Sequence, residues 1–270
     1  MKPKITYLII VLALSIITSN AQKWKNEKLP EKLKLDNSEI RSYQMTTDYL
    51  NYDFYGNFRD RIRISGIATY ESENDSVMWK NVIKSYSKNQ NGDFPQGARI
   101  NYLENFKYIP GEHILTETFF NQIPEADVFV KNLFWDLMGF DVFAYTFWDS
   151  LHLNTEFSSH SINSIVDIAG DGTFENKDIR LTWIGYSKIN SELCAIIKFS
   201  AMNNPLKIEL ENMSMRGRSH YWGEVYVSLE DKQIEYATLN EDVLTDVKLK
   251  GLDQNMMGYT VRNINLTRIQ

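Results

Sequence analysis

The sequence predicts an α+β fold: a long, curved antiparallel sheet, half-barrel-like, with one helical, aromatic-rich insert near residues 124–153. Two observations predict it. Apolar and polar residues alternate with period two after residue 61 and again after residue 179, as half-buried strands require. Between these regions lies an apolar run with helical spacing. A curved sheet can bury such an insert against its apolar face.

Composition and charge exclude several classes of protein. Of the 270 residues, 43% are hydrophobic and 24% are charged, so the chain is neither disordered nor fibrous. The 29 basic and 35 acidic residues give a net charge of -6, and no basic block is present. The chain therefore has no electrostatic footprint for nucleic acid or for anionic lipid. Cys194 is the single cysteine, which excludes a disulfide framework and a thiolate metal cluster, and no cofactor is expected.

The first 21 residues predict a secretory signal peptide. Lys2 and Lys4 precede an apolar run over residues 5–17, and Ser19 and Ala21 provide the small residues of a cleavage site. An uncleaved anchor is the alternative, but the run is short for a membrane span. No cysteine follows the run, so the protein is not expected to be lipidated. We therefore expect a soluble mature protein, exported to the periplasm or the extracellular space, without a transmembrane segment.

The first part of the mature chain divides into a lead-in and a domain. Residues 22–60 are polar, then rich in tyrosine, and are assigned to a polar lead-in, while residues 61–270 form a single β-rich domain. Strands are expected from residue 61, over 77–86 and over 99–106, with a turn at 89–97. The apolar phase shifts across Ser65 and Gly66, which indicates a β-bulge.

The insert begins after Pro124, Glu125 and Asp127, residues typical of a helix N-terminus. Two apolar rows four residues apart predict a helix buried on most of its circumference, broken at Gly139. From residue 179 onward the alternation predicts an antiparallel meander with a second bulge between Thr238 and Asp242.

In its order of elements the chain weakly resembles the periplasmic lipoprotein-carrier and lipid-binding half-barrel proteins. The resemblance covers most of the mature chain but rests on no diagnostic motif, and residues 160–189 and the tyrosine-rich lead-in have no counterpart. It implies a ligand bound against the sheet, and no functional residue is carried over from it.

The aromatic residues of the insert are the first candidate site. Rings offer a large contact area with few rotamers to freeze, which suits a pocket for an apolar ligand. The alternative is that they form the hydrophobic core, as apolar residues at helical spacing generally do. The candidate ligand-binding residues are Phe134, Trp135, Phe140, Phe143, Phe147 and Trp148.

A polar cluster is the second candidate. Arg216, Arg218, His220 and Trp222 lie close together in sequence and could bind an anion or stack on a sugar. The alternative is a tight hairpin at Gly217 with ordinary cross-strand aromatic pairs.

A third candidate is an acidic loop. Residues 167–178 match part of a calcium-loop pattern, with Asp167, Asp171 and Asp178 as candidate metal ligands and Gly172 at the turn position. Ala169 and the following strand pattern depart from that motif, and an acidic β-turn is the alternative.

Catalytic motifs are weak. Asp149 and His152 could form an acid–base pair, and carboxylates for glycoside hydrolysis could come from Asp136, Asp141, Asp149 and Glu156. No G-x-S-x-G, H-E-x-x-H or phosphate-binding loop is present. The sequence therefore favours a non-catalytic binding protein whose partner is an apolar small molecule or lipid. A secreted hydrolase acting on glycan or lipid, and a structural envelope domain without a ligand, remain as alternatives; the oligomeric state is not indicated.

Overall fold

The computed structural model describes residues 28–29, 40–71, 76–158, 163–253 and 255–269. The predicted signal peptide, and residues 22–27 and 30–39 of the predicted lead-in, lie outside the described residues. Strands dominate, and the only long helix among the described residues is α3. The strands are β1 Arg41–Asp53, β2 Phe58–Tyr70, β3 Val77–Ser87, β4 Ala98–Arg99, β5 Phe106–Tyr108, β6 Glu156–Ser158, β7 Ser164–Asp167, β8 Gly172–Asn176, β9 Arg180–Ile189, β10 Glu192–Leu210, β11 Met213–Ser228, β12 Ile234–Leu249 and β13 Met256–Ile269. The helices are α2 Glu117–Phe120, α3 Val128–Tyr145 and the 3-10 turns η1 Asn101–Leu103, η2 Glu112–Leu115 and η3 Trp148–Ser150.

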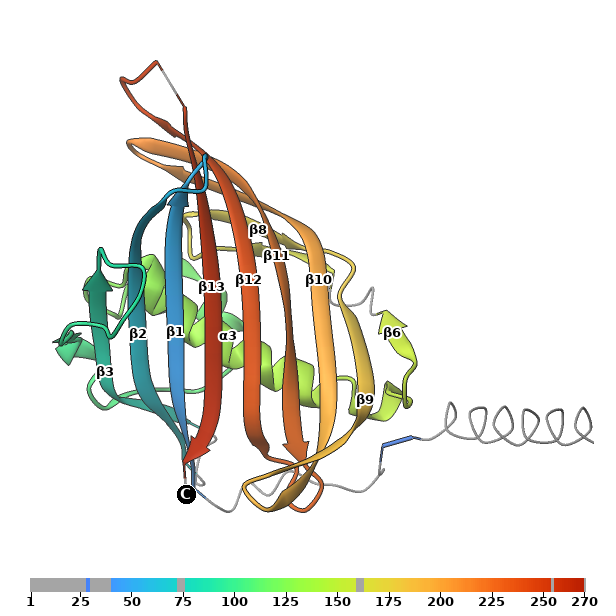
Figure 1. Cartoon of the computed structure of the whole chain (residues 1–270). Coiled ribbons are helices and arrows are strands. Elements are labelled where there is room, and N and C mark those ends of the chain that lie inside the picture. The colour runs from blue at the N-terminus through green and yellow to red at the C-terminus, as the bar shows by residue number, and fades with distance from the viewer. Residues whose placement is uncertain (1–27, 30–39, 72–75, 159–162, 254, 270) are drawn as a thin grey trace, which may run out of the picture.

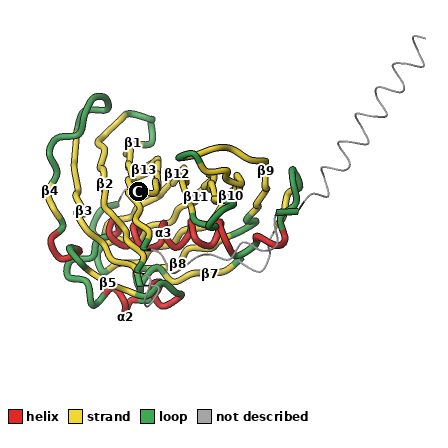
Figure 2. The backbone as a smooth tube through the Cα atoms, turned by 90° about the horizontal axis from the view of Figure 1, so that it is seen from below, coloured by secondary structure: helices red, strands yellow, loops and turns green. Residues whose placement is uncertain are grey.

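The described strands form one antiparallel sheet. Its order is β4-β3-β2-β1-β13-β12-β11-β10-β8-β7, and β9 pairs with the first half of β10. Because β1 pairs with β13, the first and last long strands lie side by side in the middle of the sheet. The sheet curls around α3, which crosses its concave face (Figures 1 and 2). The predicted curved antiparallel sheet with a helical insert is confirmed.

α3 begins where the sequence predicts. The Asp127 carboxylate caps the helix by accepting the Val130 N–H at 3.0 Å. The predicted break at Gly139 is wrong, since the helix continues through this residue to Tyr145. An added Cβ at Gly139 would meet only the Phe143 ring, at 3.9 Å. A single glycine costs a helix only about 1 kcal/mol, which the burial of α3 on both sides outweighs.

The sheet begins earlier than predicted. β1 lies within the segment assigned to a polar lead-in, so the predicted boundary of the β-rich domain at residue 61 is wrong. The inner face of β1 is made by Tyr43, Met45, Thr47 and Tyr49, which alternate with polar residues. Tyrosine and threonine fit a pleated sheet well, but they make the hydrophobic alternation weak in the sequence.

Other local predictions also change. A register shift does occur at Ser65, but the extra residue is Asn81 of β3, with φ of 52°, and β2 keeps its phase. The second shift lies at Tyr226, opposite Glu235, and not between residues 238 and 242. Residues 99–106 are not a strand, because η1 interrupts them. Gly217 is in the middle of β11 rather than in a hairpin.

The inner face of the sheet changes character along the strands. The core fills its lower and middle part, around α3. Above the core lies a layer of buried polar side chains: Asp136 of α3, Asn204, Ser219, Glu241 and Arg262. Beyond that layer the long strands β10–β13 continue toward the hairpin end of the molecule (Figure 1).

Candidate ligand-binding site

The aromatic residues of the insert are packed into the core. Phe134 is fully buried. Its ring centroid lies between 4.8 and 5.9 Å from the ring centroids of five other aromatic residues: Trp79, Phe106, Tyr108, Phe119 and Phe120. Phe143 stacks on Phe199 of β10 at 4.1 Å. Rings of the protein therefore surround the Phe134 side chain and cover one face of Phe143.

The remaining rings of the insert are also engaged. Phe140 and Trp148 are buried, and Phe147 packs on Phe157 at 5.3 Å. Trp135 is half-buried, and its indole N–H donates to the Ile114 carbonyl at 3.0 Å. The arrangement corresponds to the core alternative for the insert. Many of the ring contacts around α3 are edge-to-face, a geometry that aromatic pairs prefer.

The second predicted cluster lies on the opposite side of the sheet. Arg216, Arg218, His220 and Trp222 alternate along β11 with Ser219 and Tyr221, which are buried on the inner face. Successive strand residues point to opposite faces, so these four side chains lie on the outer face. The two predicted groups therefore cannot line one pocket, because the sheet separates them.

Two of these outer residues stabilise a bulge. Met202 and Asn203 of β10 lie together opposite His220, and Asn203 adopts φ of 64°. The His220 Nδ1 accepts the Asn203 N–H at 3.2 Å, and the Arg218 guanidinium donates to the Asn203 side chain at 2.8 Å. A bulge inverts the phase of a strand, so Leu206 and the alternate residues after it face inward.

The structure does not bring the predicted calcium ligands together. Asp171 and Asp178 lie at opposite ends of β8, whose five residues extend roughly 15 Å. Asp171 instead forms an ion pair with Lys131 at 2.5 Å, and Asp167 accepts the Gly170 N–H. Calcium ligands lie about 2.3–2.6 Å from the ion, so this set cannot share one. In the structure the loop forms an acidic turn in which the three predicted ligands are apart.

A cavity of about 360 Å³ lies beside that turn, between α2 and the β7–β8 connection. Its lining includes Glu117, Asn121, Glu125, Lys131 and Asp171, and none of the predicted ligand-binding residues. The Lys131 ammonium is already paired with Asp171, so the cavity offers no free buried charge to a ligand.

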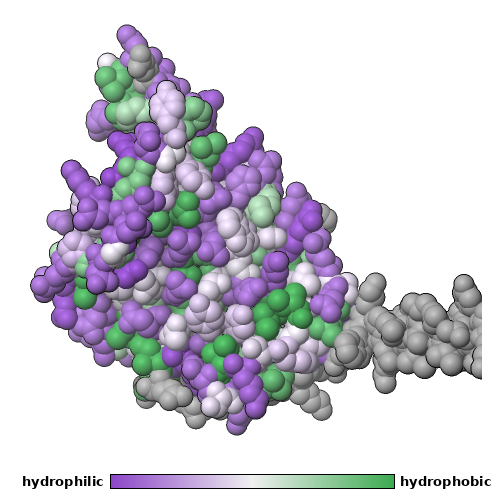
Figure 3. Space-filling model, in the orientation of Figure 1, coloured by the Kyte–Doolittle hydropathy of each residue, from purple (hydrophilic) through white to green (hydrophobic). Residues whose placement is uncertain are grey.

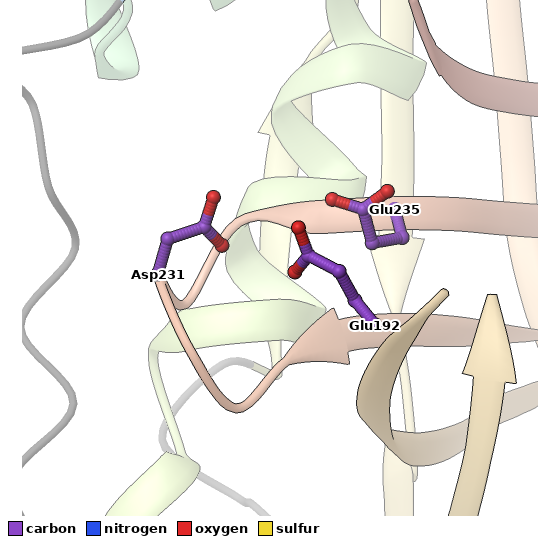
Figure 4. Close-up of side chains that lie close together, drawn as sticks. All are labelled: Glu192, Asp231 and Glu235. Carbon is purple, nitrogen blue, oxygen red and sulfur yellow. The ribbon is translucent and has the colours of Figure 1, made fainter. Parts of the chain in front are cut away.

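An acidic group that the sequence did not indicate lies at the opposite end of the sheet. Glu192, Asp231 and Glu235 approach one another at the β11–β12 turn, with carboxylate oxygens within 4.8 Å (Figure 4). Arg268 donates to Asp231 at 2.7 Å and to Glu235 at 2.5 Å. Its guanidinium supplies the positive charge that a metal ion would otherwise bring, so the group is a salt-bridge cluster.

Two carboxylates of α3 have a raised pKa: Asp136, which is buried, and Asp141, which is partly buried. Asp136 and Glu241 share the Arg262 guanidinium, and Ser219 donates to Glu241 at 2.5 Å. Burial raises the pKa of Asp136 to about 6; Arg262 opposes the rise and Glu241 adds to it. Burial likewise raises the pKa of Asp141 to about 6, against the Tyr70 hydroxyl that donates to it at 2.7 Å. Neither carboxylate lines the cavity beside α2.

The other predicted acid–base residues are dispersed. Asp149 is exposed in η3, and His152 pairs with Lys28 and Thr155 in isolated bridges rather than facing Asp149 on a helix. Glu156 forms an exposed ion pair with Arg180. The helical geometry that the Asp149–His152 pair requires is absent, because the helix ends at Tyr145.

An apolar surface that the sequence analysis missed lies on the inner face near the hairpin end. In register, Ile208 pairs with Met215, Met215 with Val247, and Val247 with Met256, so these four side chains form one row across four strands. The neighbouring rows add more apolar residues. We call the whole set the inner strip: Leu206, Ile208, Leu210, Met213, Met215, Val247, Leu249 and Met256.

The inner strip is separate from the core. None of its side chains belongs to the core cluster or packs against it, and Leu210 and Met256 are 46% and 45% exposed. The buried polar layer of Glu241 and Arg262 lies between the two. The alternation of Leu206, Ile208 and Leu210 is visible in the sequence. The side of the sheet on which these three residues lie is not visible in the sequence, because it depends on the bulge at Asn203.

Comparisons with known proteins give no family. No protein-family model and no curated protein matches the sequence. Among solved structures, the chain is similar to one described as "Lipid-protein interactions in lipovitellin", with a TM-score of 0.46 and 12% identity over 88% of this chain. It spans 26% of that chain. A DUF1329 family protein from Desulfovibrio piger has a TM-score of 0.14 and 8% identity over 86% of this chain and 87% of its own. The function therefore has to be inferred from the residues of this chain.

Within the described residues, no helix combines the length and apolarity that crossing a membrane requires.

Proposed function

We propose that this chain is an exported, non-catalytic binding protein for an apolar or amphipathic, lipid-like ligand. The observation that carries the proposal is the inner strip, eight apolar residues side by side on the concave face of an open sheet. Concave surfaces lined by apolar side chains are the usual sites for such ligands. The proposal moves the site from the aromatic insert to the strip.

The composition of the inner strip suits ligands of variable shape. Met213, Met215 and Met256 are unbranched and polarisable, and methionine adapts to irregular apolar partners. The polar layer that begins at Glu241 and Arg262 closes the strip toward the core. An acyl chain would lie along the strip, with its polar end toward solvent at the hairpin end.

Titration with a fluorescent fatty acid tests the proposal. Met215→Asp places a charge in the middle of the strip. We expect it to weaken binding roughly tenfold or more, because a carboxylate would replace apolar surface that the ligand buries when it binds. Ser214→Asp is the matched control, since Ser214 is the neighbouring residue on the outer face. Equal affinities for the two variants, or no saturable binding by the parent protein, would contradict the proposal.

A second measurement separates the strip from the insert. Phe134→Ala should lower stability but leave the probe affinity of the folded protein unchanged, because Phe134 lies in the core. Native mass spectrometry of protein from its own host should show a co-purifying lipid-like ligand on the parent and less of it on Met215→Asp.

A further inference from the structure

We propose that the hairpin end of the sheet docks onto the surface of a zwitterionic phospholipid bilayer. The inference goes beyond the proposed function and does not depend on it, because the two use different side chains. Three hairpins lie at that end, β1–β2, β10–β11 and β12–β13, and the last projects farthest (Figure 1). Their proximity follows from the register, in which Asp53 pairs with Gly258, and Met213 with Leu249.

The hairpin tips expose large apolar side chains. Phe54 and Tyr55 of the β1–β2 turn are 57% and 87% exposed, and Leu252 and Met257 of the β12–β13 hairpin are 51% and 38% exposed. Figure 3 shows hydrophobic residues exposed among hydrophilic ones at this end of the surface. Clustered apolar side chains on an exposed surface mark an interaction site, and aromatic residues favour the interface of a bilayer.

The charges beside the tips fit a zwitterionic headgroup layer. Residues 53–59, 207–216 and 246–253 carry five basic and five acidic side chains, in a chain whose net charge is -6. Arg216, Lys248 and Lys250 are exposed and form no ion pair with any described residue, so they are free to meet lipid phosphates.

Two acidic side chains at the same end already accept hydrogen bonds from other residues of the protein. Asp53 accepts hydrogen bonds from Asn57 and from the Tyr55 N–H, and Asp246 accepts one from Asn255. The balanced charge at the tips permits contact with neutral lipid, whereas the acidic remainder of the chain would be repelled by a strongly anionic surface.

The test is flotation of the purified protein with phosphatidylcholine vesicles. We expect the parent to float. The double variant Leu252→Asp/Met257→Asp should partition into the vesicle fraction at least roughly tenfold less, because two apolar side chains that would enter the bilayer interface are replaced by charged ones. Phe54→Asp on a different hairpin should act in the same direction. All three positions are exposed, so the variants should fold normally, which circular dichroism checks.

Ile40→Asp is the matched control. Ile40 is 68% exposed but lies at the opposite end of β1, so its substitution should leave flotation unchanged.

Absence of flotation by the parent, or an equal loss in the control, would overturn the proposal. Binding that appears only when the vesicles contain phosphatidylglycerol would overturn its zwitterionic character. A parent dimer that Leu252→Asp dissociates, without vesicle binding, would instead identify a self-association surface. Loss of flotation with intact fatty-acid binding would leave the proposed function standing.

Discussion

The carboxylates of Asp136 and Asp141 in α3 make stability depend on pH in a direction opposite to ordinary acid denaturation. Asp136 and Asp141 have a pKa of about 6 in the folded protein, against 3.8 as the ordinary value. Since the raised pKa means that the fold disfavours the charged form, each group destabilises the protein above pH 6. The penalty disappears as the pH falls from 6 toward 4.

The magnitude follows from the size of the shift. A rise from 3.8 to about 6 corresponds to about 3 kcal/mol for each carboxylate at neutral pH. Between pH 7 and pH 5 each group recovers somewhat more than about 1 kcal/mol. We therefore expect the free energy of unfolding to rise by about 2–3 kcal/mol over this interval.

Urea unfolding at pH 5, 6 and 7 measures this effect, with Asp136→Asn/Asp141→Asn as the variant that removes both titrations. The asparagines can keep the hydrogen bonds to Arg262 and Tyr70, and Glu241 still neutralises Arg262. The variant should show a flatter pH profile. A parent protein whose stability is constant or falls toward pH 5, or a variant with the parental slope, would refute the reasoning.

Three further predictions concern the core, the acidic loop and processing. Phe134→Ala should cost about 3–5 kcal/mol in urea unfolding, because five surrounding rings leave little room for collapse; a cost below about 1 kcal/mol would indicate a ligand-lining ring instead. Millimolar calcium should leave the melting temperature unchanged, and a shift abolished by Asp171→Ala would disprove this. Intact-mass analysis should find the exported protein beginning at Gln22, and retention of Met1 would rule out cleavage.

The fold could be predicted because strand and helix periods are properties of local sequence. The rows of apolar residues across 128–145 and the alternation along β11 and β12 both predict their elements. β1 was not predicted, because its inward-facing residues include Tyr43, Thr47 and Tyr49. Tyrosine and threonine are equally common on solvated surfaces. The break predicted at Gly139 does not occur, because the helix-propensity cost of one glycine, about 1 kcal/mol, is small beside the free energy gained by burying a whole helix.

The site could not be predicted because its position depends on pairing between distant strands. Arg218 and His220 resembled a binding cluster, since two charged or titratable groups near a tryptophan suit an anion. Both contact Asn203, across the β10–β11 pair, which lies fifteen residues before Arg218 and seventeen before His220. No local pattern specifies which face of the sheet a residue occupies when an unrecognised bulge lies between it and the core.

That bulge joins the sequence, the fold and the proposed site. Before it, the inner residues of β10 are Phe199 and Ala201, at odd positions; after it they are Leu206, Ile208 and Leu210, at even positions. Without the extra residue at Asn203, the same leucines and isoleucine would face outward, and Lys207 and Glu209 would replace them beside Met215. The Arg218 and His220 contacts to Asn203 therefore stabilise the bulge, and with it the register that places apolar side chains on the concave face. This assigns the predicted polar cluster a positioning role, on the face of the sheet opposite the proposed ligand.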